Sequence, residues 1–113
     1  MIMDLFARLA VTDLRRAIAW GDKLFGEVES FAPNDTEHVW TLGEHLHVYA
    51  ELLPRHAGHC AVTLFLDDVE SFLAAAADRG LLPDSEEVYE NGVRKAIFLD
   101  PDGNEVGIGG APA

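Results

Sequence analysis

The chain has 113 residues, a formal net charge of −12 and one cysteine, which predicts a single acidic domain without an internal disulfide. Its 8 basic against 20 acidic residues argue against binding to nucleic acid or to anionic membrane surfaces, because both select Lys and Arg. No apolar run approaches the ~20 residues of a membrane-spanning helix, and the acidic N-terminal stretch lacks the basic start of a signal peptide. We therefore expect a globular cytoplasmic protein that binds neither nucleic acid nor membranes.

The first half of the chain predicts a strand, a helix and three further strands. Residues 5–11 alternate between an apolar face and a mixed face, which is typical of a half-buried strand. Thr12 or Asp13 can cap the helix that follows, and Gly26 fits the C-terminal end of that helix. Three shorter strands are predicted next, at residues 28–31, 38–42 and 45–53.

After a linker at residues 54–58 the same order of elements repeats. A strand at residues 59–66 precedes a helix that Asp67 or Asp68 can cap and Gly80 can end. Three strands follow, at residues 86–89, 93–99 and 104–108. The matched spacing predicts one domain, 1–113, built from two units at about 3–53 and 59–110. The residues expected to be buried between sheet and helix are Leu5, Leu9, Val11, Val48, Val62, Leu64 and Phe72.

The last two strands are joined by a turn of sequence Asp-Pro-Asp-Gly-Asn at residues 100–104. Pro101 presets the first turn position, Asp100 can accept a hydrogen bond from the turn backbone, and Gly103 can adopt a positive φ without steric cost. The chain is therefore expected to close with a hairpin.

Three stretches occur together: LAVTDL at residues 9–14, WGDKLFG at residues 20–26 and the turn at residues 100–104. In this combination the chain resembles the glyoxalase / bleomycin-resistance / extradiol-dioxygenase superfamily, also called vicinal oxygen chelate proteins. The resemblance covers nearly the whole chain. It implies an α+β fold of two βαβββ units that form a cupped, mostly antiparallel eight-stranded sheet with helices on the outer face. It also implies a ligand in the cup, which in this superfamily often lies across a dimer.

Metal-dependent members hold a divalent cation on the cup face, and the resemblance maps their ligand positions onto Phe6, His47, His59 and Gly107. Phe6 and Gly107 carry no metal-binding side chain, so we expect neither the metal site nor any other cofactor. The alternative is a rearranged divalent metal site, because imidazole and carboxylate groups suit first-row metals. Its ligands would be His47, His59 and Glu51 or Glu105.

Aromatic and polar side chains on the predicted cup face are the remaining candidates for ligand contacts. They are Phe6, Arg8, Trp40, His45, His47, Tyr49, His59, Thr63 and Phe65. Aromatic walls with a few polar groups describe a small-molecule pocket, and Arg8 can pair with an anionic ligand or with a nearby glutamate. The same aromatic residues are equally suited to packing at the seam of a dimer. The ligand-binding residues we predict are Phe6, Arg8, Trp40, His47, Tyr49, His59 and Thr63.

The leading hypothesis is a metal-free binding protein, rather than an enzyme, for a small aromatic or cationic organic molecule. This function is similar to that of the bleomycin-resistance branch of the superfamily. One alternative is a metal-dependent lyase, isomerase or dioxygenase with a shifted ligand set, and another is a dimeric accessory protein without a ligand. We expect a homodimer, because eight strands and two helices leave a broad sheet face to cover and closed twofold pairs are the commonest solution.

Overall fold

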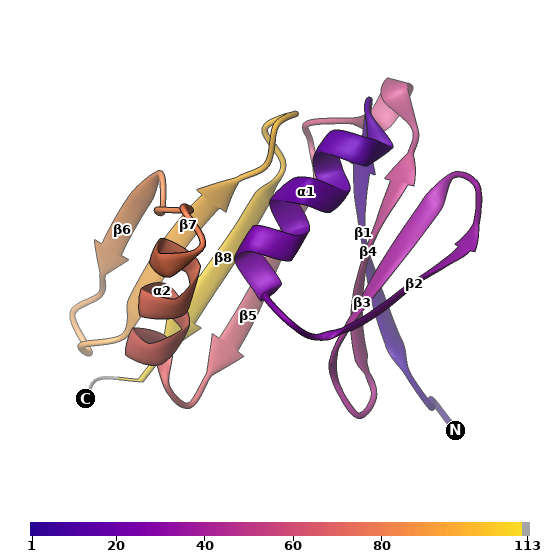
Figure 1. The fold of residues 1–113 in the computed structure, drawn as a ribbon. Coiled ribbons are helices and arrows are strands. Elements are labelled where there is room, and N and C mark those ends of the chain that lie inside the picture. The colour runs from indigo at the N-terminus through magenta and orange to yellow at the C-terminus, as the bar shows by residue number, and fades with distance from the viewer. Residues whose placement is uncertain (112–113) are drawn as a thin grey trace.

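The computed structural model describes residues 1–111, which form two similar units of one strand, one helix and three strands (Figure 1). The first unit contains β1 (Leu5–Val11), α1 (Leu14–Phe25), β2 (Glu29–Asn34), β3 (Glu37–Gly43) and β4 (Leu46–Leu52). A single 3-10 turn, η1 (Pro54–His56), leads into the second unit. The second unit contains β5 (Ala61–Leu66), α2 (Val69–Asp78), β6 (Ser85–Val88), β7 (Arg94–Leu99) and β8 (Glu105–Gly110).

Each unit builds its own four-stranded sheet, with strand orders β1-β4-β3-β2 and β5-β8-β7-β6. The first strand of each unit is parallel to the last, and the other neighbouring strands are antiparallel. The predicted α+β fold with two βαβββ units is confirmed. The eight strands, however, form two separate sheets rather than one, because within residues 1–111 no ladder joins β1 to β5.

Of the two capping candidates for each helix, Asp13 caps α1 and Asp68 caps α2. A side-chain oxygen of Asp13 accepts a hydrogen bond from the backbone N–H of Arg16 at 3.1 Å, and Asp68 accepts one from Ser71 at 3.0 Å. Gly26 then ends α1 with a φ of 75°, a conformation that glycine adopts without strain. Within residues 1–111 no helix is long and apolar enough to cross a membrane.

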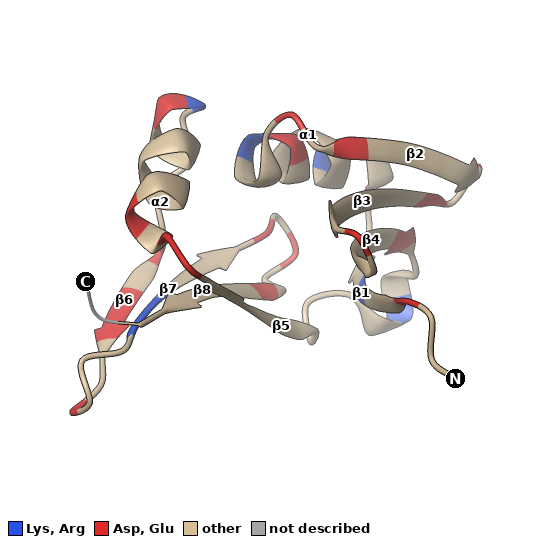
Figure 2. Cartoon of the chain, turned by 90° about the horizontal axis from the view of Figure 1, so that it is seen from below, with Lys and Arg blue, Asp and Glu red and all other residues tan. Residues whose placement is uncertain are grey.

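The apolar faces of both sheets meet the two helices in one core. Helix α1 packs against β3 and β4, and α2 packs against β8 and α1. The largest fully buried side chains are Trp40, Phe98, Leu24, Ile108, Val11, Val48, Val106 and Asn104. Figure 2 shows the two sheets at a steep angle, with both helices inside that angle. The faces that the helices leave uncovered therefore point outward in different directions, and one chain does not enclose a cup between them.

One buried side chain, Asn104, joins the two units at their seam. Its amide nitrogen donates to the carbonyl oxygen of Ala10 at 2.7 Å and to a carboxylate oxygen of Asp100 at 2.7 Å. Its amide oxygen accepts from the backbone N–H groups of Gly58 and Cys60, both at 3.0 Å. Every hydrogen-bonding position of this amide is used, so the turn at residues 100–104 holds the edge of β1 as well as closing its own hairpin.

Two further contacts reinforce this seam. The Asp102 carboxylate accepts from the backbone N–H of Thr12 at 3.0 Å and from its hydroxyl at 2.6 Å. At the other end, the guanidinium of Arg79 donates to the carbonyl oxygens of Lys23 at 2.6 Å and Leu24 at 3.0 Å. Arg79 thereby satisfies the last carbonyls of α1 from the end of α2, so each unit completes an element of the other.

The predicted core is largely present, with one correction. Leu9, Val11 and Val48 are buried, and Val62, Leu64 and Phe72 pack partly buried against the core. Leu5 was expected to be buried but is 60% exposed. Helix α1 packs on β3 and β4, so the beginning of β1 extends past the helix that would have covered it.

Candidate functional site

The uncovered face of the first sheet carries a groove with aromatic walls. Strand alternation brings Phe6 of β1 and Tyr49 of β4 to this face, and their rings meet edge to face with centroids 6.4 Å apart. The groove has a volume of about 390 Å³. Its lining residues are Phe6, Phe31, Pro33, Glu37, Val39 and Tyr49. An open apolar groove with few polar groups suits a flat organic molecule.

Arg8 lies on the same face but is already paired. A guanidinium nitrogen of Arg8 is 3.3 Å from a carboxylate oxygen of Glu51, and both side chains are partly exposed. The pair is worth little to stability at such exposure. It does neutralise the charge of Arg8, so within one chain this arginine is not a free anchor for an anionic ligand.

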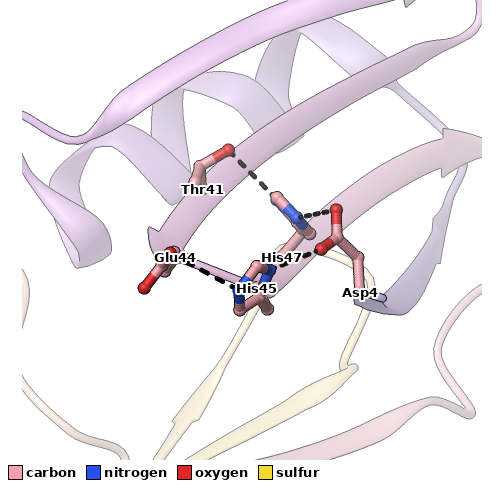
Figure 3. A network of polar contacts seen from close by, with 5 residues as sticks. All are labelled: Asp4, Thr41, Glu44, His45 and His47. Carbon is pink, nitrogen blue, oxygen red and sulfur yellow. Dashed lines mark hydrogen bonds and ion pairs between the residues drawn. The ribbon is translucent and has the colours of Figure 1, made fainter. Parts of the chain in front are cut away.

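A network of polar contacts surrounds His47 at the start of β4 (Figure 3). One carboxylate oxygen of Asp4 is 2.9 Å from Nδ1 of His45, and the other is 3.2 Å from Nε2 of His47. The second ring nitrogen of His47 lies 3.1 Å from the Thr41 hydroxyl. The ring of Phe6 stacks on His47, with centroids 4.2 Å apart and planes inclined by 13°. Both nitrogens of His47 are thus engaged with protein groups.

The same contacts perturb Asp4. The hydrogen bond with His45 is the main reason that the pKa of this carboxyl lies below its usual value of 3.8; desolvation opposes this shift, and contacts with His47 add to it. Asp4 is therefore a carboxylate throughout the neutral range and holds the N-terminal segment against the beginning of β4. Glu44, 3.6 Å from Nε2 of His45, adds a second negative charge to this end of the sheet.

The residues that a superfamily metal site would require do not come together. Phe6 and Gly107 offer no donor, and His59 is exposed on the segment before β5. The alternative set of His47, His59 and Glu51 forms no metal-binding group either. Among residues 1–111 there is no group of three or more His, Cys, Asp and Glu side chains that could hold a metal ion. Within one chain, the described side chains thus bring no such ligand group together.

Trp40 does not lie where the sequence analysis placed it. Its ring is on the helix-facing side of β3, only 1% exposed, and packs against Phe25 with centroids 5.5 Å apart. The indole nitrogen donates to Asp22 on α1 at 3.0 Å. Gly21 makes this position possible, because a β-carbon there would clash with the indole ring. Trp40 therefore belongs to the core rather than to the predicted cup face.

The uncovered face of the second sheet carries Thr63 and Phe65 of β5, as the alternation predicted. The structure adds Lys95 of β7, whose side chain lies beside Gly107 of β8. The sequence analysis overlooked this lysine, together with Phe31 and Val39 of the groove. Lys95 could have been predicted for this face, because along β7 it alternates with Ala96 and Phe98, which are buried. Predicted site residues are thus divided between two outward faces: Phe6, Arg8, His47 and Tyr49 on one, Thr63 and Phe65 on the other.

Two βαβββ units with outward sheet faces define the class of protein as glyoxalase-like, and comparison with known proteins identifies the family. A glyoxalase / bleomycin resistance protein from Catenulispora acidiphila DSM 44928 is 43% identical, with a TM-score of 0.91 over 97% of this chain and 99% of that one. The chain belongs to the glyoxalase / bleomycin resistance protein family. No protein-family model and no curated protein matches the sequence.

More distant solved structures share the fold alone. A bleomycin-binding protein in complex with bleomycin is 19% identical, with a TM-score of 0.75 over 95% of this chain and 97% of that one. A bleomycin resistance determinant encoded on transposon Tn5 is 17% identical, with a TM-score of 0.77 over 97% and 98%. A lactoylglutathione lyase from Agrobacterium tumefaciens is 16% identical, with a TM-score of 0.75 over 94% and 91%. One fold is thus shared by a binding protein, a resistance determinant and a lyase.

Proposed function

We propose that this protein binds a small aromatic organic molecule without a metal ion, and that the ligand lies in the groove on the uncovered face of β1–β4. The single observation that carries this proposal is the groove of about 390 Å³ walled by Phe6, Phe31 and Tyr49. This volume lies in the range of about 300–1,000 Å³ typical of small-molecule sites. The likeness to a bleomycin-binding protein in complex with bleomycin supports the same class of function.

A second copy of the chain completes the site in this proposal. The uncovered faces of one chain point apart, so a ligand on the first sheet is enclosed only when the second sheet of a partner covers it. An apolar cleft of about 250 Å³ between β1 and β5 also exposes Leu5, Leu46 and Phe65. Exposed apolar surface of this kind is typical of an interface. We propose a homodimer in the cytoplasm, where Cys60 remains reduced.

The neutral fluorophore N-phenyl-1-naphthylamine tests the groove. The natural protein is expected to bind it with a dissociation constant in the micromolar range, and Tyr49→Ala is expected to weaken binding about tenfold, because one aromatic wall is removed. Tyr89→Ala is the matched control, since Tyr89 lies outside the groove and bonds Glu87. An absence of saturable binding, or equal losses in the two variants, would refute the groove as the binding site.

Two measurements test the rest of the proposal. Elemental analysis of protein purified without added metal is expected to find far less than one divalent ion per chain. One tightly held ion per chain would instead favour the alternative of a metal-dependent enzyme. Sedimentation velocity at micromolar concentration is expected to show a dimer, and a monomer would contradict the composite site.

A further inference from the structure

Lys95 lies across a space that the absence of a side chain at Gly107 creates. A β-carbon on Gly107 would be 2.6 Å from Cε and 3.5 Å from Nζ of Lys95, and 3.2 Å from the hydroxyl oxygen of Thr63. The ammonium and the hydroxyl thus flank the same point on the uncovered face of the second sheet. Both groups can donate hydrogen bonds, and any larger residue than glycine would push the lysine away.

The ammonium of Lys95 has no ion-pair partner within residues 1–111, although the chain carries 20 acidic residues. Its cross-strand neighbour is Glu87, whose carboxylate instead accepts a hydrogen bond from the Tyr89 hydroxyl at 2.8 Å. Glu105 shares the face but forms no ion pair with the lysine either. The adjacent Arg94, on the helix side, pairs with two glutamates. The cation on the outward face is therefore not neutralised by the described part of the chain.

An aromatic surface adjoins this cation. The ring of Phe65 lies 3.6 Å from the point that a β-carbon on Gly109 would occupy, and it is 65% exposed. Gly107 and Gly109 are two residues apart on β8, a separation of about 7 Å along a strand. The two hydrogen-bond donors, Lys95 and Thr63, thus lie two strand residues away from the ring of Phe65, on which a flat molecule can stack.

We propose that Lys95 and Thr63 bind the acidic group of the ligand, and that the ligand class is therefore aromatic acids, such as aromatic carboxylates. This inference rests on the proposed function, because it concerns the ligand of the same dimeric site. The ammonium and the hydroxyl each donate one hydrogen bond to the acidic group, while the aromatic rings of the dimeric site bind the aromatic part of the ligand. The net charge of −12 repels anions at long range, so this preference comes from local contacts alone.

A pair of fluorescent probes separates this inference from the general function. 8-Anilinonaphthalene-1-sulfonate and N-phenyl-1-naphthylamine share one ring system, and only the first carries an anionic group. Lys95→Gln is expected to weaken binding of the sulfonate probe about tenfold, the usual effect of losing a charge-assisted hydrogen bond. Binding of the neutral probe is expected to change less than about twofold, because it makes no such bond.

Two further variants control for charge and for folding. Lys23→Gln removes the same charge from the exposed end of α1 and is expected to leave both probes unaffected. Gly107→Ala keeps the charge but displaces the lysine side chain, so it should weaken the sulfonate probe selectively even if Lys95→Gln folds poorly. Equal effects of the two lysine variants, equal effects on the two probes, or dissociation of the dimer in Lys95→Gln would overturn the proposal. Failure of both probes to bind the natural protein would instead refute the proposed function itself.

Discussion

Replacing Asn104 with alanine is expected to destabilise the protein more than any other single substitution in the turn at residues 100–104. The amide is fully buried and makes four hydrogen bonds. At about 1 kcal/mol for each bond, the loss amounts to about 4 kcal/mol. A domain of this size has a free energy of unfolding of about 5–15 kcal/mol, so the variant should lose a large fraction of its stability.

The alanine side chain would leave the buried carbonyl of Ala10 and the partly buried N–H groups of Gly58 and Cys60 without the partner that Asn104 supplies. Unsatisfied groups cost more than the average hydrogen bond contributes, while a water molecule in the vacated space would reduce the loss. Urea unfolding followed by far-ultraviolet circular dichroism measures the difference, at one protein concentration because dimer formation adds to apparent stability. The melting temperature should fall by roughly 15 °C.

Asn91→Ala is the matched control for this experiment. The Asn91 side chain accepts a single hydrogen bond, from the backbone N–H of Val93 at 3.1 Å, in an exposed turn. Its replacement is expected to cost less than about 1 kcal/mol. If Asn104→Ala costs no more than this control, the reasoning that the amide holds the two units together is wrong.

Three further predictions concern other contacts. Arg79→Ala should lower the free energy of unfolding by about 2 kcal/mol in the same urea assay, because the last carbonyls of α1 lose their donors. Arg79→Lys should recover little of this stability, since lysine lacks the forked geometry of the guanidinium. Gly21→Ala should lower the melting temperature, because a β-carbon would displace the ring of Trp40. This loss should outweigh the helix preference of alanine over glycine, which is about 1 kcal/mol. A raised melting temperature would contradict the close packing of Gly21 against Trp40. The lowered pKa of Asp4 means that its contact with His45 contributes stability above the usual pKa of 3.8 and loses it as pH falls through the lowered value. Carbon-detected NMR titration of the Asp4 carboxyl measures this pKa, and Asp4→Asn should abolish this contribution to the pH dependence of stability.

Local signals in the sequence were sufficient to predict the order of the elements. Asp13 and Asp68 cap the two helices as expected, because a side-chain carboxylate can accept from the first free N–H groups wherever the helix is packed. Strand alternation likewise placed Phe6 and Tyr49 on one face. These features depend only on neighbouring residues, so they can be predicted without knowing how the units pack.

Features that depend on packing between elements could not be predicted in this way. Both faces of β3 carry apolar residues, so alternation alone does not say which face holds Trp40. The answer depends on Gly21, a residue of a different element, because only glycine leaves room for the indole ring. Lys95 reaches diagonally to Gly107 from the opposite strand, a contact that sequence spacing does not reveal. That the two sheets stay separate also depends on the angle between the units.

The bridge from Asn104 to Ala10 spans 94 positions of the chain, which has a consequence for biosynthesis. The ribosome releases β1 first, yet the groups that satisfy its outer edge belong to the final hairpin. Until that hairpin emerges, the nascent N-terminal unit presents an unfinished strand edge and exposed leucines, and such intermediates aggregate readily. Folding of the first unit is therefore completed only after the second unit has been synthesised.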